Sequence, residues 1–218
     1  MTLPLFDAHS EPGTGTAVVL GPGASLLPGF ALAGEENLLA SLDSVIEASP
    51  LRHMETPGGH RMSVAMTNCG ELGWVSSRSG YRYASVDPET GRAWPCMPEG
   101  FLLLAQSAAD RAGFQGFVPN ACLVNRYEVG ARMTLHQDKD ERDFTQPIVS
   151  VSLGLPASFL FGGERRSDAA AKISLQHGDV VVWGGPSRLR FHGVAPIKQG
   201  QHTQLGPVRY NLTFRFVG

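Results

Sequence analysis

The most regular alternation of hydrophobic and polar positions lies near the C-terminus, in residues 209–216. The apolar positions are Tyr210, Leu212, Phe214 and Phe216, and the polar positions are Arg209, Asn211, Thr213 and Arg215. Such alternation predicts a β-strand with one face on a hydrophobic core and, in the ordinary case, the other face in water. A solvated face more often carries Lys, Glu and Ser than two Arg with an Asn between them, so this polar face is unusual.

Other short apolar stretches, separated by Gly and Pro, predict the rest of a β-rich domain. One short strand is expected at 17–20, and six more follow at 121–127, 148–155, 158–161, 172–175, 180–183 and 189–192. Many short strands with turns between them are typical of a double-sheet jelly roll. We therefore predict a mainly β fold of this type.

Two stretches have helical spacing instead. In residues 35–48 the apolar positions Leu38, Leu42 and Val45 share one side, and the pattern stops before Pro50. Pro98 begins a second helical stretch, which Gly113 ends. Helices of this kind are expected to pack on a sheet.

Residues 52–97 lose this periodicity and mix Gly with aromatic and basic side chains, among them Trp74, Tyr81 and Arg92. One interpretation is a structured insertion packed by its own aromatic residues. The other is a lid that recognises nucleotides, because cations bind phosphates and aromatic rings stack on bases.

Composition suits a single globular domain. The chain has 218 residues, of which 42% are hydrophobic and 17% charged. Its net charge of −2 argues against a surface coated in positive charge, so nucleic acid would have to meet local basic residues. Arg outnumbers Lys by 15 to 3, which favours geometric binding of carboxylate or phosphate.

The three cysteines, Cys69, Cys96 and Cys122, form no C-x-x-C motif and are odd in number. With no signal peptide, they indicate free thiols in a reducing cytoplasm. No apolar run is long enough for a membrane span, so no membrane association is expected.

Candidate metal ligands occur at His136 and Asp138. In an extended backbone alternate side chains share one face, so these two and Asp140 would point the same way. An imidazole and a carboxylate supply two of the three ligands of a 2-His-1-carboxylate iron site, and His192 is the candidate third ligand. The motif alone is equally compatible with a polar loop.

A second His-x-Asp pair, His177-Gly178-Asp179, competes for this role. Gly-Asp is turn chemistry, and the apolar run 180–183 follows directly, so we interpret this pair as a turn that enters a strand. The polar face of residues 209–216 favours the first pair, because two Arg beside an iron site suit a dicarboxylate.

Several motifs resemble the AlkB family of iron(II)- and 2-oxoglutarate-dependent dioxygenases, in particular its bacterial DNA-repair members. They are TPGG (56–59), MSVAMTNCG (62–70), LGW (72–74), NRY (125–127), LHQDKD (135–140), IVSVSLG (148–154), HGDVVVWGG (177–185) and RYNLTFR (209–215). Together they run in order from about residue 50 to the C-terminus. One departure is His60, where the family has a Tyr in its nucleotide-recognition segment.

The resemblance implies a double-stranded β-helix, the jelly-roll core, with N-terminal helices that buttress it. It divides the single domain, residues 1–218, into three parts. These are an N-terminal extension and helix (1–50), a nucleotide-recognition lid (51–97), and a helix plus dioxygenase core (98–218).

The resemblance also implies roles for individual residues. The ligands of Fe(II) would be His136, Asp138 and His192, with an open position for O2. The residues that bind the cosubstrate 2-oxoglutarate would be Asn125, Tyr127, Arg209, Asn211 and Arg215, the last of which also counts as catalytic. The residues that contact the substrate would be Trp74, Tyr81, Asp140 and Arg166. Trp74 and His136 would flank the base, and Asp140 would face its exocyclic amine.

The implied activity is oxidative demethylation of N-alkylated bases, such as 1-methyladenine and 3-methylcytosine, with release of formaldehyde, succinate and CO2. The expected substrate is alkylation-damaged single-stranded DNA, with RNA left open, because a duplex hides the alkylated edge unless the nucleotide is flipped out. A cytoplasmic monomer is expected.

Two other classes stay open. A dioxygenase of the same fold would act on a small molecule or a protein, although the aromatic and basic residues of 52–92 argue against it. A binding module would carry a vestigial or non-iron metal site, although three ligands together with two Arg argue against that.

Overall fold

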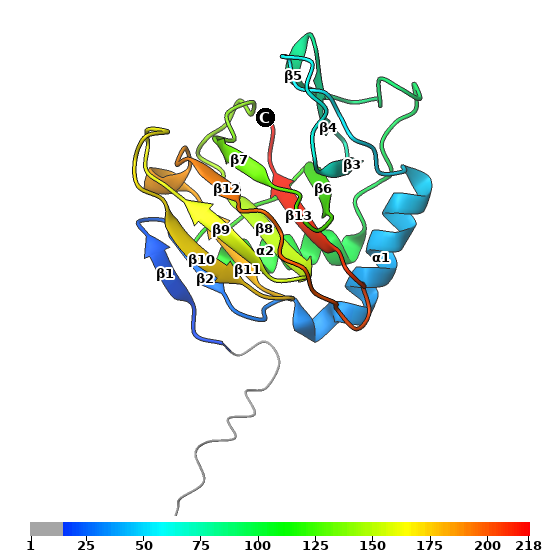
Figure 1. Cartoon of the computed structure of the whole chain (residues 1–218). Coiled ribbons are helices and arrows are strands. Elements are labelled where there is room, and N and C mark those ends of the chain that lie inside the picture. The colour runs from blue at the N-terminus through cyan, green and yellow to red at the C-terminus, as the bar shows by residue number, and fades with distance from the viewer. Residues whose placement is uncertain (1–14) are drawn as a thin grey trace, which may run out of the picture.

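Two β-sheets face each other in the computed structural model, which describes residues 15–218 (Figure 1). The first 14 residues of the predicted N-terminal extension lie outside the described residues. The large sheet has the strand order β1-β2-β11-β8-β13-β6-β3, and the smaller sheet has the order β10-β9-β12-β7. Every neighbouring pair of strands is antiparallel. This is the double-stranded β-helix, or jelly roll, that the sequence predicts.

The large sheet consists of β1 (Val18–Gly21), β2 (Ala24–Leu27), β3 (Ala65–Gly70), β6 (Ala121–Tyr127), β8 (Ile148–Gly154), β11 (Val180–Trp183) and β13 (Arg209–Arg215). The smaller sheet consists of β7 (Met133–His136), β9 (Ala157–Phe161), β10 (Ala171–Leu175) and β12 (His192–Val194). A separate hairpin is formed by β4 (Gly73–Ser77) and β5 (Gly80–Ala84). The helices are α1 (Glu35–Ala48) and α2 (Glu99–Arg111), with 3-10 turns η1 (Leu32–Gly34) and η2 (Gly185–Ser187).

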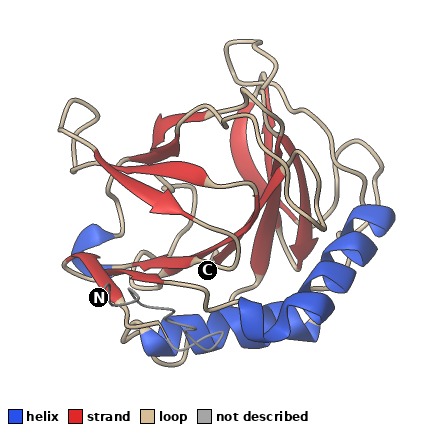
Figure 2. Cartoon of the chain, turned by 60° about the horizontal axis from the view of Figure 1, so that its bottom comes forward, coloured by secondary structure: helices blue, strands red, loops and turns tan. Residues whose placement is uncertain are grey.

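Both helices cover the outer face of the large sheet (Figure 2). Leu38 and Leu42 of α1 and Phe101 of α2 pack in one core with the apolar side of β13. Phe101 meets Phe214 edge to face, with 5.9 Å between the ring centroids. The helix predicted at 35–48 is confirmed, and α2 begins directly after Pro98 as the sequence indicates.

A second core lies between the two sheets and includes Ile148, Phe159 and Trp183. The polar side of β13 faces this space, so that Arg209 is only 1% exposed and Arg215 only 7%. The ordinary expectation of a solvated polar face is therefore wrong, because the smaller sheet covers that face.

The strand predicted at 189–192 is wrong at its start, since β12 begins only at His192. The preceding residues form η2 and a turn in which the Arg190 N–H donates to the Ser187 carbonyl (3.1 Å). The Arg188 side chain points inward and is buried, which leaves the apolar Leu189 37% exposed. The strand predicted at 17–20 is β1, and its partner β2 was not predicted.

The segment 52–97 contributes β3 to the edge of the large sheet, while β4 and β5 project above it as a hairpin (Figure 1). Within the segment, the Trp94 indole packs on Gly73 so closely that a Cβ would not fit. Two hydrogen bonds of 2.7 Å join Arg52 to Asp87. The segment is thus packed by its own aromatic and charged residues.

Among residues 15–218, no helix has the length and the apolar composition that crossing a membrane requires.

Candidate active site

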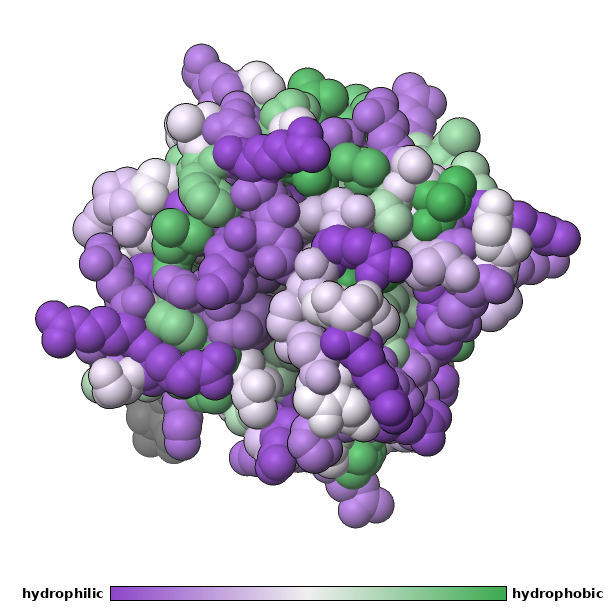
Figure 3. Space-filling model, turned by 90° about the horizontal axis from the view of Figure 1, so that it is seen from above, coloured by the Kyte–Doolittle hydropathy of each residue, from purple (hydrophilic) through white to green (hydrophobic). Residues whose placement is uncertain are grey.

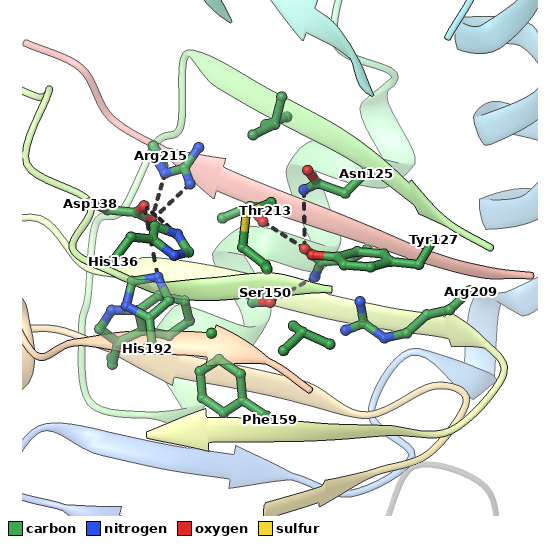
Figure 4. Close-up of a pocket in the computed structure, with 16 residues that line it drawn as sticks. Asn125, Tyr127, His136, Asp138, Ser150, Phe159, His192, Arg209, Thr213 and Arg215 are labelled. Atoms are coloured by element: carbon green, nitrogen blue, oxygen red, sulfur yellow. Dashed lines mark hydrogen bonds and ion pairs between the residues drawn. The ribbon is translucent and has the colours of Figure 1, made fainter. Parts of the chain in front are cut away.

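His136, Asp138 and His192 come together between the sheets (Figure 4). His136 ends β7 and His192 begins β12, and the two are register partners. Asp138 follows two residues after His136, as the sequence motif requires. One ligand atom from each residue lies within 4.8 Å of the others. Within the described residues this is the one group of three or more such side chains with metal-binding spacing.

Both imidazoles are oriented by main-chain carbonyls. Nδ1 of His136 lies 2.9 Å from the Thr134 carbonyl, and Nδ1 of His192 lies 3.0 Å from the Arg190 carbonyl. A carbonyl only accepts, so each Nδ1 carries a proton, and Nε2 is the ring nitrogen that each histidine can offer to a ligand. The two Nε2 atoms lie 3.6 Å and 3.7 Å from Oδ1 of Asp138. Outer contacts of this kind commonly fix metal-binding histidines.

His192 is held in its neutral form. Burial, together with the neighbouring His136, lowers its pKa to about 4. A neutral imidazole is the form that binds a metal ion.

The two oxygens of the Asp138 carboxylate have different neighbours. Its Oδ2 accepts hydrogen bonds from Nε (3.0 Å) and Nη2 (2.7 Å) of Arg215, while Oδ1 faces the two histidines. Burial raises the pKa of this carboxyl, but the Arg215 charge and the two histidines outweigh it and bring the pKa below its ordinary value. Asp138 therefore stays ionised and can offer one oxygen to a metal ion.

Arg209 is a buried cation without a carboxylate. Nη2 donates to the Ser152 hydroxyl (3.0 Å), but Nε and Nη1 have no partner among the described residues. The guanidinium carbon lies 5.0 Å from the ring centre of Tyr127. An unpaired buried charge is unfavourable, so this end of the site fits an anion.

A narrow cavity of about 50 Å³ connects Arg209 with the three candidate metal ligands. Asn125, Tyr127 and Asn211 also line it. The Asn125 amide donates to Asn211 Oδ1 (3.2 Å), whereas its own Oδ1 has no partner among the described residues. The residues predicted to bind 2-oxoglutarate thus surround one cavity, with an unpaired cation at one end and the predicted metal ligands at the other.

A second cavity of about 490 Å³ opens on the other side of His136 and Asp138. The four predicted substrate contacts, Trp74, Tyr81, Asp140 and Arg166, all line it. The face of the molecule that is seen from above in Figure 3 is mainly hydrophilic, with small separate apolar patches. The two cavities share the candidate metal ligands His136 and Asp138.

Asp140 does not continue the strand, because β7 ends at His136. Its Oδ2 accepts a hydrogen bond of 2.8 Å from the Trp74 indole. Trp74 in turn stacks on Tyr81, with 5.4 Å between the ring centroids. Arg166 lies over the ring of Phe191 at 5.5 Å. Asp140 thus reaches the second cavity through the loop that follows β7.

The second His-x-Asp pair is a turn, as predicted. Gly178 has φ +84°, and the Asp179 carboxylate accepts hydrogen bonds from the main-chain N–H of Gly29 (2.8 Å) and Gln176 (2.7 Å). His177 accepts from the Gly154 N–H (2.8 Å). Both side chains therefore stabilise the main chain around this turn through hydrogen bonds.

Sequence reasoning missed three residues beside the site, of which Glu141 and Arg188 are buried and Tyr83 is half-buried. Glu141 and Arg188 form an ion pair of 3.0 Å, and the Tyr83 hydroxyl donates to Glu141 (2.5 Å). No local pattern marks them, because each lies in a different segment of the chain. Glu141 follows the conspicuous Asp138 and Asp140, which is the only signal that points to it.

Comparison with known proteins agrees with this arrangement. The family model of the 2OG-Fe(II) oxygenase superfamily matches residues 23–215. The chain is 55% identical over 199 residues to alpha-ketoglutarate-dependent dioxygenase AlkB of Escherichia coli (strain K12), which covers 91% of this chain and 92% of that protein. It is 33% identical over 123 residues to nucleic acid dioxygenase ALKBH1 of Mus musculus. This match covers 56% of this chain and 31% of that protein. A solved structure of OsALKBH1 is 30% identical in sequence to this chain and superimposes on it with a TM-score of 0.80. The superposition covers 92% of this chain and 100% of the OsALKBH1 chain.

Proposed function

The chain belongs to the AlkB family of the 2OG-Fe(II) oxygenase superfamily, and we propose that it oxidatively removes alkyl groups from nucleic acid bases with Fe(II), 2-oxoglutarate and O2. The observation that carries this proposal is the unpaired buried Arg209 in the same cavity as His136, Asp138 and His192. An anion site beside a 2-His-1-carboxylate group is what an iron enzyme with a dicarboxylate cosubstrate requires.

In this proposal Fe(II) is held by His136, Asp138 and His192. The donor set fits, since both Nε2 atoms and Oδ1 can be offered to a metal ion and point toward one another. Arg215 neutralises the far oxygen of Asp138 and so keeps the near oxygen oriented.

Five residues would bind 2-oxoglutarate: Asn125, Tyr127, Arg209, Asn211 and Arg215. Arg209 would pair with the carboxylate distant from the metal, because its Nε and Nη1 have no partner in the part of the chain that the structure describes. Arg215 lies beside Asp138 and would meet the end near the metal. When bound, Fe(II) and 2-oxoglutarate supply the oxidising chemistry, in which O2 and 2-oxoglutarate yield succinate and CO2 and the methyl group leaves as formaldehyde.

The larger cavity would hold the alkylated base. Trp74 and Tyr81 offer aromatic surface, Asp140 a carboxylate and Arg166 a cation. The base must leave its stack to enter, because its alkylated edge is hidden in a duplex. Single-stranded DNA carrying 1-methyladenine or 3-methylcytosine is the proposed substrate, with RNA as the alternative.

The proposed setting is a cytoplasmic monomer. The cysteines support the compartment, since Cys69, Cys96 and Cys122 are all free thiols in the structure. Free thiols persist in reducing compartments, which also suit an enzyme that needs Fe(II).

The test is incubation of a single-stranded oligonucleotide containing 3-methylcytosine with the protein, Fe(II), 2-oxoglutarate and ascorbate. Mass spectrometry should show loss of one CH2 unit, and succinate should form in equal amount. An unmethylated oligonucleotide is the control. If both oligonucleotides leave succinate formation at its basal level, the substrate is a small molecule or a protein instead. If 2-oxoglutarate is never consumed, the chain is a binding module.

A further inference from the structure

The carboxylate of Glu141 lies at the centre of a buried network beside the candidate metal ligands. Its side chain is 2% exposed. Oε1 accepts a hydrogen bond of 2.5 Å from the Tyr83 hydroxyl and lies 3.4 Å from Nε of Arg215. Oε2 accepts a hydrogen bond of 3.0 Å from Nη2 of Arg188. Two hydrogen bonds and the ion pair with Arg215 hold this carboxylate in place, because moving it would leave buried polar groups unpaired.

Both arginines that contact Glu141 also hold Asp138. Arg215 donates twice to Oδ2, at 3.0 Å and 2.7 Å, and Arg188 donates to the main-chain carbonyl of Asp138 at 2.7 Å. Arg188 is itself anchored on the Gln146 carbonyl (3.0 Å). Asp138 is therefore fixed at its side chain and at its backbone by two cations that share Glu141 as a counterion.

A third connection leads to the β4–β5 hairpin. Tyr83 and Trp74 are register partners across this hairpin, so their side chains project from the same face. They reach consecutive residues of the loop after β7, since Trp74 donates to Asp140 and Tyr83 to Glu141. The hairpin is thus attached to this loop at two adjacent points, and the Tyr83 contact continues into the buried network.

We propose that Glu141 is a positioning residue, which sets the orientation of the Asp138 carboxylate through Arg215 and Arg188 and ties the β4–β5 hairpin to it through Tyr83. Glu141 holds the Arg215 guanidinium so that two donors reach Oδ2 of Asp138, and Oδ1 remains turned toward the histidines. The inference rests on the proposed function, because it assigns Glu141 a role toward the same metal ion.

Three variants test this inference. Glu141→Gln keeps the shape but replaces one acceptor oxygen by an NH2 group, Tyr83→Phe removes only the connection to the hairpin, and Glu47→Gln on the exposed side of α1 is the matched control. Mn(II), a redox-stable substitute for Fe(II), is titrated into each full-length variant and followed by electron paramagnetic resonance. Hydrogen exchange of the amides of residues 73–84 is measured in parallel.

Glu141→Gln should weaken Mn(II) binding by about 10-fold or more, the usual effect of losing an outer contact of a metal ligand. It should also speed amide exchange in the hairpin. Tyr83→Phe should speed the exchange and leave the Mn(II) affinity close to that of the unmodified chain. Glu47→Gln should change neither.

Unchanged Mn(II) affinity in a folded Glu141→Gln variant would overturn the inference. If Glu141→Gln does not fold, Tyr83→Phe provides the test. Amide exchange of residues 73–84 that is unchanged in Tyr83→Phe would contradict the proposed connection between Glu141 and the β4–β5 hairpin. Neither measurement depends on turnover. A protein that binds Mn(II) as expected but does not demethylate would contradict the proposed function and leave this inference standing.

Discussion

Arg209 and Arg215 lie on the same face of β13, yet their charge environments are opposite. Burial lowers the pKa of Arg215, but the charge of Asp138 more than offsets this and raises it overall. Burial lowers the pKa of Arg209, which has no carboxylate partner among residues 15–218. One guanidinium is neutralised inside the protein, and the other is available to an anionic ligand.

Replacing Arg209 should affect 2-oxoglutarate binding and the free energy of unfolding in different ways. Arg209→Met should weaken 2-oxoglutarate binding by about 2–5 kcal/mol, because the ligand carboxylate would lose its partner in a closed site. The free energy of unfolding without ligand should stay constant or rise by about 1–4 kcal/mol, since an unpaired buried charge is removed. Calorimetric titration and denaturant unfolding measure the two quantities. A KM for 2-oxoglutarate equal to that of the unmodified enzyme would remove Arg209 from the site.

Metal binding should depend on one His-x-Asp pair and not on the other. His136→Ala, Asp138→Ala and His192→Ala should each abolish turnover, together with the visible charge-transfer band that Fe(II) and 2-oxoglutarate give without oxygen. Asp179→Ala should keep the band and lose about 1–3 kcal/mol of stability, because two main-chain N–H groups lose their acceptor. A band that survives His136→Ala and vanishes in Asp179→Ala would show that the other pair holds the metal.

Asp140 should discriminate between cationic and neutral bases. 3-Methylcytosine is cationic near neutral pH and 3-methylthymine is not, and a charge-assisted hydrogen bond in a closed site contributes about 1.5–3 kcal/mol. Asp140→Ala should therefore lower kcat/KM for 3-methylcytosine on the order of 10- to 100-fold more than for 3-methylthymine.

The hydrogen bond from Trp74 supplies the control for Asp140, because Trp74→Phe removes the indole N–H and keeps an aromatic ring. Equal losses on both substrates in Asp140→Ala, matched by Trp74→Phe, would mean that Asp140 only holds Trp74 in place.

At the scale of elements, the pairing of Asp87 with Arg52 joins distant parts of the segment 52–97. Burial raises the pKa of Asp87, but its hydrogen bonds to Arg52 and to the Glu89 N–H outweigh this and lower it overall. A carboxyl with a lowered folded pKa stabilises the protein above its unfolded pKa, which is 3.8 in the ordinary case. That stability is lost as the pH falls through the lower folded pKa.

Asp87→Asn should destabilise the protein by about 1–3 kcal/mol at neutral pH, because Arg52 loses an ionised partner. The difference from the unmodified protein should shrink as the pH falls below about 4, because Asp87 of the unfolded chain binds a proton there, and shrink further as the pH falls through the lower folded pKa. Urea unfolding at several pH values measures this difference in the free energy of unfolding. A difference that is independent of pH would show that the charge of Asp87 plays no part.

At the scale of the whole molecule, the 18 Lys and Arg are balanced by 20 Asp and Glu, so attraction to nucleic acid must come from local basic residues. Of the basic residues that line the larger cavity, Arg215 is paired with Asp138, which leaves Lys139 and Arg166. Binding to a single strand loses affinity with a logarithmic salt slope of about −0.7 per phosphate contact, so a slope near −1.4 is expected.

Arg166→Ala should bring that slope to about −0.7, whereas Lys172→Ala, an exposed lysine on β10, should leave it unchanged. Fluorescence anisotropy with a labelled oligonucleotide at several salt concentrations measures the slope. A much steeper slope would indicate that nucleic acid follows a larger basic surface outside the cavity.

The sequence by itself determined the features that depend on local backbone geometry. Helical spacing located 35–48, and period-two alternation assigned Leu212 and Phe214 to one side of β13 and Arg209 and Arg215 to the other. The same alternation predicted that His136 and Asp138 point to one face, and the two do meet, although β7 ends at His136 and Asp138 lies in the loop that follows. Gly-Asp turn chemistry excluded His177 and Asp179 from the metal site. Each of these features follows from residues a few positions apart.

Only the tertiary structure decided which distant groups meet. His192 reaches Asp138 because β12 pairs with β7 in one register, and a slip of one residue would turn it to the other face. Whether an arginine on β13 is paired or free depends on what the neighbouring segments place opposite it. Within residues 15–218, the loop after β7 places Asp138 and Glu141 beside Arg215, whereas strand β8 offers Arg209 only the Ser152 hydroxyl. The roles of Tyr83, Glu141 and Arg188 also depend on the tertiary structure. These residues lie in three segments without a local sequence pattern, and they form one network only in the folded protein.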